Sequence, residues 1–97
     1  MRHRGRVDAN QGEIVKALRM AGMSVQSLAN IGSGCPDILI GDPRTRTNLL
    51  AEIKDGSKPP SQRRLTADEQ KWHDEWRGQV AVVESVEDAL RLVGRLR

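Results

Sequence analysis

Apolar positions near the start of the chain recur at helical spacing. The residues that form this stripe are Ile14, Ala17, Leu18 and Ala21. Their three- and four-residue spacing predicts an amphipathic helix that ends at Gly22, because helices commonly end where glycine can adopt a left-handed conformation. Asp8 is expected to cap the N-terminus of this helix, with Gln11 three residues later completing a capping-box pattern.

Short apolar runs bounded by glycine and proline predict four strands. They cover residues 24–29, 37–40, 49–54 and 79–83. The second and third runs are joined by a turn, so we expect them to form a hairpin. Two further helices follow from capping signals: Thr66 with Glu69 begins one over residues 66–77, and Ser85 begins another over residues 85–96. The order α-β-β-β-α-β-α predicts an α/β fold, with helices flanking a mixed sheet.

The size and charge of the chain narrow the possible functions. Its 97 residues are expected to form one domain, with residues 1–7 as a basic arm. The net charge is +3, and the arginines gather in three stretches. This pattern fits a surface that binds a polyanion such as nucleic acid as well as it fits a surface that is only solvated. The single cysteine indicates a reducing compartment, and no apolar run is long enough for a membrane span or a signal peptide. We therefore expect a soluble intracellular protein, with no membrane partner and no small-molecule cofactor.

Two acids and a lysine lie on two neighbouring predicted strands. Asp37 comes after Pro36, Glu52 follows fifteen residues later, and Lys54 lies two positions further on. Strand alternation points Glu52 and Lys54 to one face, and a hairpin in register lets Asp37 approach Glu52. Two converging carboxylates repel unless a cation such as Mg²⁺ lies between them, and such a centre hydrolyses phosphodiesters. Lys54 could then orient water or stabilise developing charge. The alternative is a cross-strand charge pattern on the surface.

These residues also resemble a known nuclease motif. Pro36–Asp37 with Glu52-Ile53-Lys54 resembles the PD-(D/E)xK signature. A longer stretch, roughly residues 10–93, resembles the virus-type replication-repair nuclease (VRR-NUC) domain. The resemblance lies in the runs Gly34-Cys35-Pro36-Asp37-Ile38-Leu39 and Leu50-Ala51-Glu52-Ile53-Lys54 and in residues 65–88. The resemblance implies a restriction-endonuclease-like core (αβββαβ) with a C-terminal helix, and a Mg²⁺- or Mn²⁺-dependent DNA endonuclease. The compact stand-alone members are similar to phage enzymes that form homodimers and cut branched DNA such as Holliday junctions.

The resemblance also assigns site residues, with one departure. It places the metal at Asp37, Glu52 and Ile53, and it implies a further acid on the first helix. The register of that helix puts Gln11 at this position, near the apolar stripe, whereas Glu13 lies at the rim of the stripe. Gln11 or, after a register shift, Glu13 would therefore complete the metal shell.

The resemblance adds Gln70 to the catalytic residues, since an amide there could hold a metal-bound water or a phosphate oxygen. The alternative for Gln70 is a solvated helix residue. Trp72 and Trp76 share a helix face and are expected in the core or a dimer contact, and His73 is expected at the surface.

Four residues are candidates for contacts with nucleic acid. Ser33 lies in the glycine-rich loop 30–34 and could meet a phosphate, or it could simply form a tight turn. Lys58, Arg63 and Arg64 follow the Glu52 strand and could contact phosphates beside the cut. Three rivals stay open. The first is a flap, nicking or restriction-type nuclease of the same fold. The second is a DNA-binding module with a decayed site, for which Gln11 is the one support, and the third and weakest is a small regulatory or interaction domain.

Overall fold

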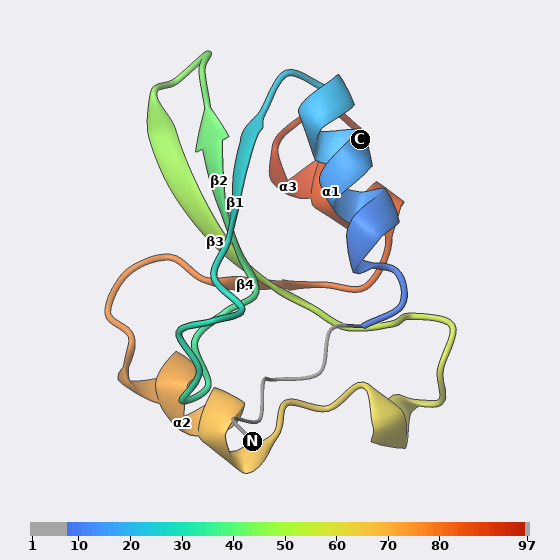
Figure 1. Cartoon of the computed structure of the whole chain (residues 1–97), viewed down its shortest axis with the longest axis vertical. Coiled ribbons are helices and arrows are strands. Elements are labelled where there is room, and N and C mark those ends of the chain that lie inside the picture. Colours follow the sequence, from blue (N-terminus) through green and yellow to red (C-terminus); the bar gives the residue numbers. More distant parts are fainter. Residues whose placement is uncertain (1–7, 97) are drawn as a thin grey trace.

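The computed structural model describes residues 8–96, so the predicted basic arm at residues 1–7 lies outside the described residues. The elements are α1 (Gln11–Met20), β1 (Ser24–Ser27), β2 (Ile38–Asp42), β3 (Thr47–Ile53), a 3₁₀ turn (Pro60–Gln62), α2 (Ala67–Glu75), β4 (Ala81–Val83) and α3 (Val86–Leu92). This order confirms the predicted one (Figure 1). None of the described helices is long and apolar enough to cross a bilayer.

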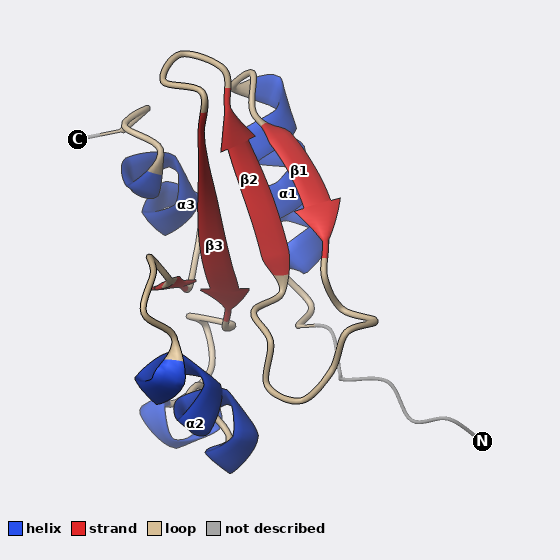
Figure 2. Ribbon diagram, turned by 90° about the vertical axis from the view of Figure 1, so that its left-hand side faces the viewer, coloured by secondary structure: helices blue, strands red, loops and turns tan. Residues whose placement is uncertain are grey.

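The four strands form one mixed sheet in the order β1-β2-β3-β4. β2 pairs antiparallel with β1 and with β3, while β4 joins β3 in parallel. α1 and α3 contact each other, and they contact β1 and β4 respectively. α2 lies apart from them, beyond the end where β3 finishes (Figure 2). The mixed sheet flanked by helices is the expected fold class.

The core lies between the sheet and the pair α1 and α3. Its fully buried side chains include Ile14, Leu18, Ile38, Ile40 and Ile53. Residues that face each other across an antiparallel pair point to the same side of the sheet, so the opposed residues Ile38 and Ala51 share the core face. Ala51 and Ile53 therefore point into the core as predicted, and the intervening Glu52 points to the opposite face.

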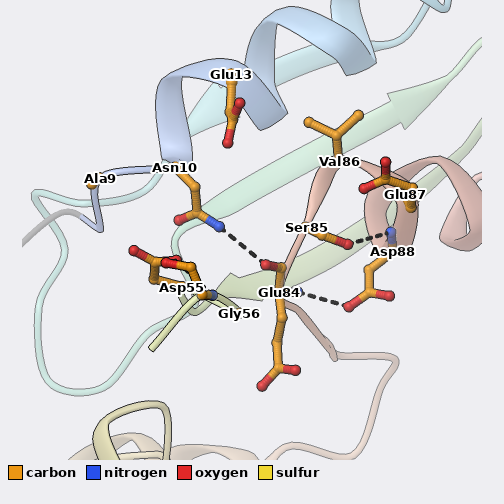
Figure 3. Close-up of a pocket in the computed structure, with 11 residues that line it drawn as sticks. Ala9, Asn10, Glu13, Asp55, Gly56, Glu84, Ser85, Val86, Glu87 and Asp88 are labelled. Atoms are coloured by element: carbon orange, nitrogen blue, oxygen red, sulfur yellow. Dashed lines mark hydrogen bonds between the residues drawn. The ribbon is translucent and has the colours of Figure 1, made fainter. Parts of the chain in front are cut away.

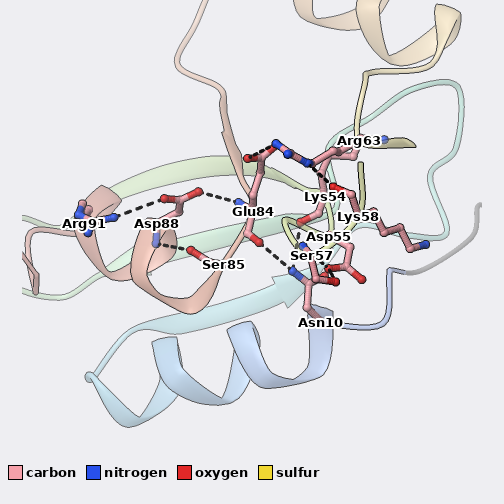
Figure 4. Close-up of polar contacts among 10 residues, drawn as sticks. All are labelled: Asn10, Lys54, Asp55, Ser57, Lys58, Arg63, Glu84, Ser85, Asp88 and Arg91. Atoms are coloured by element: carbon pink, nitrogen blue, oxygen red, sulfur yellow. Dashed lines mark hydrogen bonds and ion pairs between the residues drawn. The ribbon is translucent and has the colours of Figure 1, made fainter. Parts of the chain in front are cut away.

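The start of α1 differs from the prediction. Asp8 does not cap the helix; the N-cap is Asn10, and its side chain makes no capping hydrogen bond. The Asn10 amide instead donates to the carbonyl of Lys54 at 3.1 Å and to that of Glu84 at 3.2 Å (Figure 4). These bonds tie the helix start to the ends of β3 and β4. The helix consequently begins where tertiary partners place it, and the capping box of Asp8 with Gln11 is absent.

The starts of α2 and α3 follow the prediction. The Thr66 hydroxyl accepts from Glu69 N at 3.2 Å, and the Glu69 carboxylate accepts from Thr66 N at 2.8 Å. Ser85 caps α3 by accepting from Asp88 N at 3.0 Å. Local sequence determines both helix starts.

The loop before β2 holds α2 against the sheet end. Gly34 has a φ of +83°, and a Cβ built there would lie 2.2 Å from the carbonyl oxygen of Asp68 in the first turn of α2. Only glycine allows both that backbone conformation and that close approach. The contact brings α2 next to the start of β2, where Asp37 lies.

Candidate metal centre

The β2–β3 register brings the two predicted carboxylates together. Ile38 pairs with Ala51, so one further step places Asp37 opposite Glu52. The Asp37 carboxylate accepts a hydrogen bond from Ile53 N–H at 2.6 Å. This bond fixes the Asp37 side chain against the last residue of β3, the strand that also carries Glu52.

Glu52 is unusually buried for a glutamate, because only 2% of it is exposed. Burial, then the hydrogen bond and charge of the Asp37 carboxyl, raise the pKa of Glu52 to about 10, although Lys54 opposes the shift. Without a cation, the pair therefore retains a proton at neutral pH. Two carboxyl groups held this closely need either a shared proton or a cation.

α2 contributes Glu69 and His73, which lie four residues apart and share one helix face. Lys54 Nζ lies 2.7 Å from Glu69 Oε1. His73 Nε2 lies 3.9 Å from Glu52 Oε1. The helix therefore closes over the strand end with one acid and one imidazole.

The Lys54 ammonium is kept charged at this position. Burial alone would lower the pKa of Lys54, but the hydrogen bond and charge of Glu69, with the charge of Glu52, raise it above its ordinary value. The pKa of Glu69 is lowered against the effect of burial, because Lys54 and the backbone of Thr66 stabilise its carboxylate. Lys54 is thereby tethered as a cation beside the Asp37–Glu52 pair.

The two carboxylates of this centre are oxygen donors of the kind that a divalent cation such as Mg²⁺ binds. Asp37, Glu52 and Glu69 are opposed by one ammonium, so full ionisation leaves two negative charges. Glu52 Oε1 and His73 Nε2 are buried without a hydrogen-bond partner. Within residues 8–96, however, no group of three or more His, Cys, Asp or Glu side chains is arranged to hold a metal ion. A cation at Asp37 and Glu52 would therefore take other ligands from water or substrate, as Mg²⁺ commonly does.

The two candidates on α1 have different surroundings. Gln11 is buried, and its Oε1 also lacks a hydrogen-bond partner. Glu13 is exposed and borders a separate acidic pocket, together with Asp55 and Glu84 (Figure 3). Gln11 borders a different pocket, with Val15 of α1 and Ser27 of β1. The contact of either Gln11 or Glu13 with a metal stays a prediction.

Asp8 is an acid whose relation to the centre the sequence did not reveal. Burial raises the pKa of Asp8, and the charges of Lys54 and Asp37 act on it in opposite directions. The residue predicted as a helix cap therefore lies within electrostatic range of the centre.

Gln70 does not point toward this centre. It is exposed, and its side-chain amide donates to Asp74 at 2.8 Å. Its neighbour Glu69 holds the inward position, so the geometry lends the predicted role of Gln70 no support. The capping box at Thr66 marks where α2 begins, but it does not show which face of the helix meets the sheet.

His73 differs from expectation, and of the two places expected for the tryptophans the core is excluded while a dimer contact stays a prediction. The His73 side chain is 12% exposed and therefore not a surface residue. Its ring meets Trp72 edge-on, with centroids 6.0 Å apart. Trp72 stacks on Trp76 at 4.6 Å, yet neither belongs to the buried core, and Trp76 is 46% exposed.

The four residues predicted to contact nucleic acid differ in exposure and in their partners. Arg63 is already engaged, since it donates to the carbonyl of Lys58 at 2.7 Å and pairs with Glu84 at 3.3 Å (Figure 4). Lys58 is half-buried, whereas Arg64 and Ser33 are exposed. Ser33 has a φ of +55°, as a tight turn requires. Arg64 and Ser33 are thus the more accessible of the four.

Comparisons with known proteins address the fold. No family model and no curated protein sequence matches the chain. A solved structure described as a VRR_NUC domain is similar to it, with a TM-score of 0.63 and 24% sequence identity, over 89% of this chain and 96% of that one. The chain therefore has the fold of a VRR_NUC domain, as its sequence motifs implied.

Proposed function

We propose that this protein is a divalent-metal-dependent endonuclease that hydrolyses phosphodiester bonds in DNA. The observation that carries the proposal is the convergence of Asp37 and Glu52 beside the tethered ammonium of Lys54. The VRR_NUC fold supports the same activity.

Asp37 and Glu52 would hold Mg²⁺ or Mn²⁺, with Ile53 and Gln11 as further candidates for its shell. When bound, the ion supplies an activated water and polarises a phosphoryl oxygen. Lys54 would donate hydrogen bonds to the attacking water or to the phosphate oxygens on which negative charge develops. Glu69 positions this ammonium, because it binds Lys54 Nζ while it is itself fixed by the capping box of α2.

The proposed substrate is branched DNA, and the proposed active form is a homodimer. Both follow from the resemblance to compact phage nucleases. Symmetric cleavage of two strands needs two centres, and a two-fold dimer of a chain with one centre supplies them. The whole chain would act as one nuclease domain in an intracellular compartment that holds DNA. Ser33, Lys58, Arg63 and Arg64 would contact backbone phosphates.

The test is cleavage of a labelled four-way junction and of a linear duplex with the same arm sequence. Each is incubated with Mg²⁺, with Mn²⁺ and with chelator, using the wild-type chain, Lys54→Ala and the control Lys16→Ala. Lys16 is an exposed lysine of α1. We expect paired, metal-dependent nicks in the junction that disappear in Lys54→Ala and persist in Lys16→Ala.

Other outcomes separate the rivals. Cutting of the duplex, or of one junction strand only, would retain the nuclease and replace the resolvase by a nicking, flap or restriction-type activity. Binding of DNA without cleavage in either metal would refute the nuclease and indicate a decayed site.

A further inference from the structure

A small groove lies between α2 and the glycine-rich loop. Its residues are Asp68, Lys71, Trp72 and Glu75 of α2, with Ser33 of the loop. The four helix residues follow the spacing i, i+3, i+4 and i+7, which places them on a single face of α2. The groove has a volume of about 280 Å³. Pockets for drug-sized ligands span about 300–1,000 Å³, so this groove suits one small ring system.

Two contacts join the groove to the centre. A Cβ at Gly34 would touch the carbonyl of Asp68, so the glycine-rich loop lies directly beside the first turn of α2 (Figure 1). The Trp72 ring meets His73 edge-on, and His73 Nε2 lies 3.9 Å from Glu52 Oε1. A DNA strand that reaches Glu52 would therefore have neighbouring nucleotides beside the groove.

Trp72 supplies an aromatic wall to the groove. The residue is half-buried, and its ring stacks on Trp76 with centroids 4.6 Å apart and planes inclined by 20°. Indole and phenyl rings are common platforms for unpaired bases, because every base has a π face. The sequence contains two tryptophans and neither phenylalanine nor tyrosine, so Trp72 is one of the few such platforms that this chain has.

The charges of the groove fit a base better than a phosphate. Asp68 and Glu75 supply two carboxylates against the single ammonium of Lys71, and all three side chains are exposed. This excess of negative charge disfavours a phosphate inside the groove. A carboxylate instead accepts a hydrogen bond from the exocyclic amino group of cytosine or adenine.

We propose that the groove binds one unpaired base of the DNA substrate, which packs against the Trp72 indole and donates an amino hydrogen to the Asp68 carboxylate. The inference rests on the proposed action on DNA, and it specifies the substrate further. The preferred DNA has an unpaired base near the cut, and that base carries an amino group. A paired base would have to leave its stack first, which costs free energy.

The experiment measures DNA binding by the full chain in chelator, and again in Ca²⁺, with gels to confirm that the DNA stays uncut. The probes are labelled duplexes of one sequence that differ at a single bulged position, which holds cytosine, thymine or an abasic residue. Fluorescence anisotropy gives the affinities of the wild type, Trp72→Leu, Asp68→Ala and the control Met20→Ala. Met20 is an apolar side chain of α1 that is 79% exposed.

The wild type should bind the cytosine bulge at least about fivefold more tightly than the abasic bulge, a difference that Trp72→Leu should abolish. It should also prefer cytosine to thymine by about threefold or more, and Asp68→Ala should remove this preference. Met20→Ala should keep both differences. Retention of the first difference in Trp72→Leu, or its absence from the wild type, would overturn the inference.

Intrinsic fluorescence provides a second test that leaves Trp72 in place. Trp76→Phe keeps a ring against Trp72 and makes Trp72 the only tryptophan of a chain without tyrosine. The emission of this variant should fall when the cytosine bulge is added and change little with the abasic bulge. Equal emission changes with both probes would contradict a base packed on the indole.

The inference and the proposed function fail in different ways. Metal-dependent cleavage of the junction without any discrimination between bulges would overturn the base site and leave the nuclease intact. Discrimination between bulges without cleavage in Mg²⁺ or Mn²⁺ would retain the base site and refute the nuclease. A wild-type dimer that does not discriminate between bulges and that dissociates in Trp72→Leu would assign this face of α2 to a contact between copies of the chain.

A chain that binds none of these DNAs, in chelator or in Ca²⁺, would overturn both proposals.

Discussion

Replacing Glu52 with glutamine should stabilise the metal-free protein, although it removes a proposed metal ligand. Glu52 is buried opposite Asp37, and its pKa rises from 4.5 to about 10 on folding. A group whose pKa is raised in the folded state contributes stability that is complete below its unfolded pKa and is lost as the pH rises toward its folded pKa. Glutamine has a similar shape and carries no proton to lose, so its contribution does not change with pH.

The magnitude follows from the distance between the working pH and the unfolded pKa. At pH 7 the Glu52 carboxyl is ionised in the unfolded chain and protonated in the folded protein. The working pH lies about 2.5 units above the unfolded pKa of 4.5. At about 1.4 kcal/mol per unit, the folded wild type has lost about 3 kcal/mol relative to pH 4. Glu52→Gln should therefore be more stable than the wild type by about 3 kcal/mol at pH 7.

The assay is urea unfolding followed by circular dichroism, in chelator, at pH values from 5 to 8. The free energy of unfolding of the wild type should fall with rising pH, and that of Glu52→Gln should stay nearly level. Asp42→Asn is a control of opposite sign, because a hydrogen bond from Arg44 lowers the pKa of Asp42. The stability that Asp42 contributes is present above its unfolded pKa and is lost as the pH falls, so its removal should destabilise the protein at pH 7.

Two results would refute this reasoning. Parallel pH curves for the wild type and Glu52→Gln would mean that Glu52 is ionised in the folded protein at no cost. A variant less stable than the wild type at pH 7 in chelator would mean that the buried carboxyl stabilises the fold. Added Mn²⁺ should stabilise the wild type and leave Glu52→Gln unchanged.

Three further substitutions test the surroundings of the centre. Glu69→Gln removes the charge partner of Lys54, so junction cleavage should slow at least about tenfold. The free energy of unfolding in urea should fall by about 1–2 kcal/mol. An unchanged cleavage rate would exclude Glu69 as a positioning residue. Asn10→Ala leaves two strand-end carbonyls without their amide donor, which should lower the free energy of unfolding by about 1–3 kcal/mol; an unchanged urea midpoint would contradict this. Gly34→Ala introduces both a strained left-handed backbone and a clash with the backbone of α2, so the free energy of unfolding should fall by about 2–4 kcal/mol. The control Gly32→Ala, at a φ of +74° with open space around it, should lose only the part due to backbone strain. Equal losses in the two variants would show that the clash is relieved at no cost.

The carboxylate pair was predictable because strand geometry is local and periodic. A period of two assigns Glu52 and Lys54 to one face, and a hairpin joined by a short turn leaves few registers. The observed register places Asp37 opposite Glu52 as expected. The start of α2 was equally local, since the capping box at Thr66 closes within four residues.

The α2 side of the centre was not predictable from the same signals. The capping box shows where the helix begins but not which face meets the sheet, and neighbouring residues of a helix point about 100° apart. A rotation of one residue decides whether Gln70 or Glu69 turns inward. The contact of Gly34 with the first turn of α2 helps to set that rotation, and it brings Glu69 and His73 to the centre.

The sequence by itself determined the element order, the starts of α2 and α3, and the positions of Asp37, Glu52 and Lys54 on or next to β2 and β3. These features depend on contacts between neighbours in the chain or on the simple repeat of a strand. The tertiary structure alone decided that α1 begins at Gln11, that Glu52 is buried, and that Glu69 and His73 face it. Each of these depends on partners 15 to 74 positions away in the sequence, and such partners are chosen by the packing of whole elements, which no local pattern encodes.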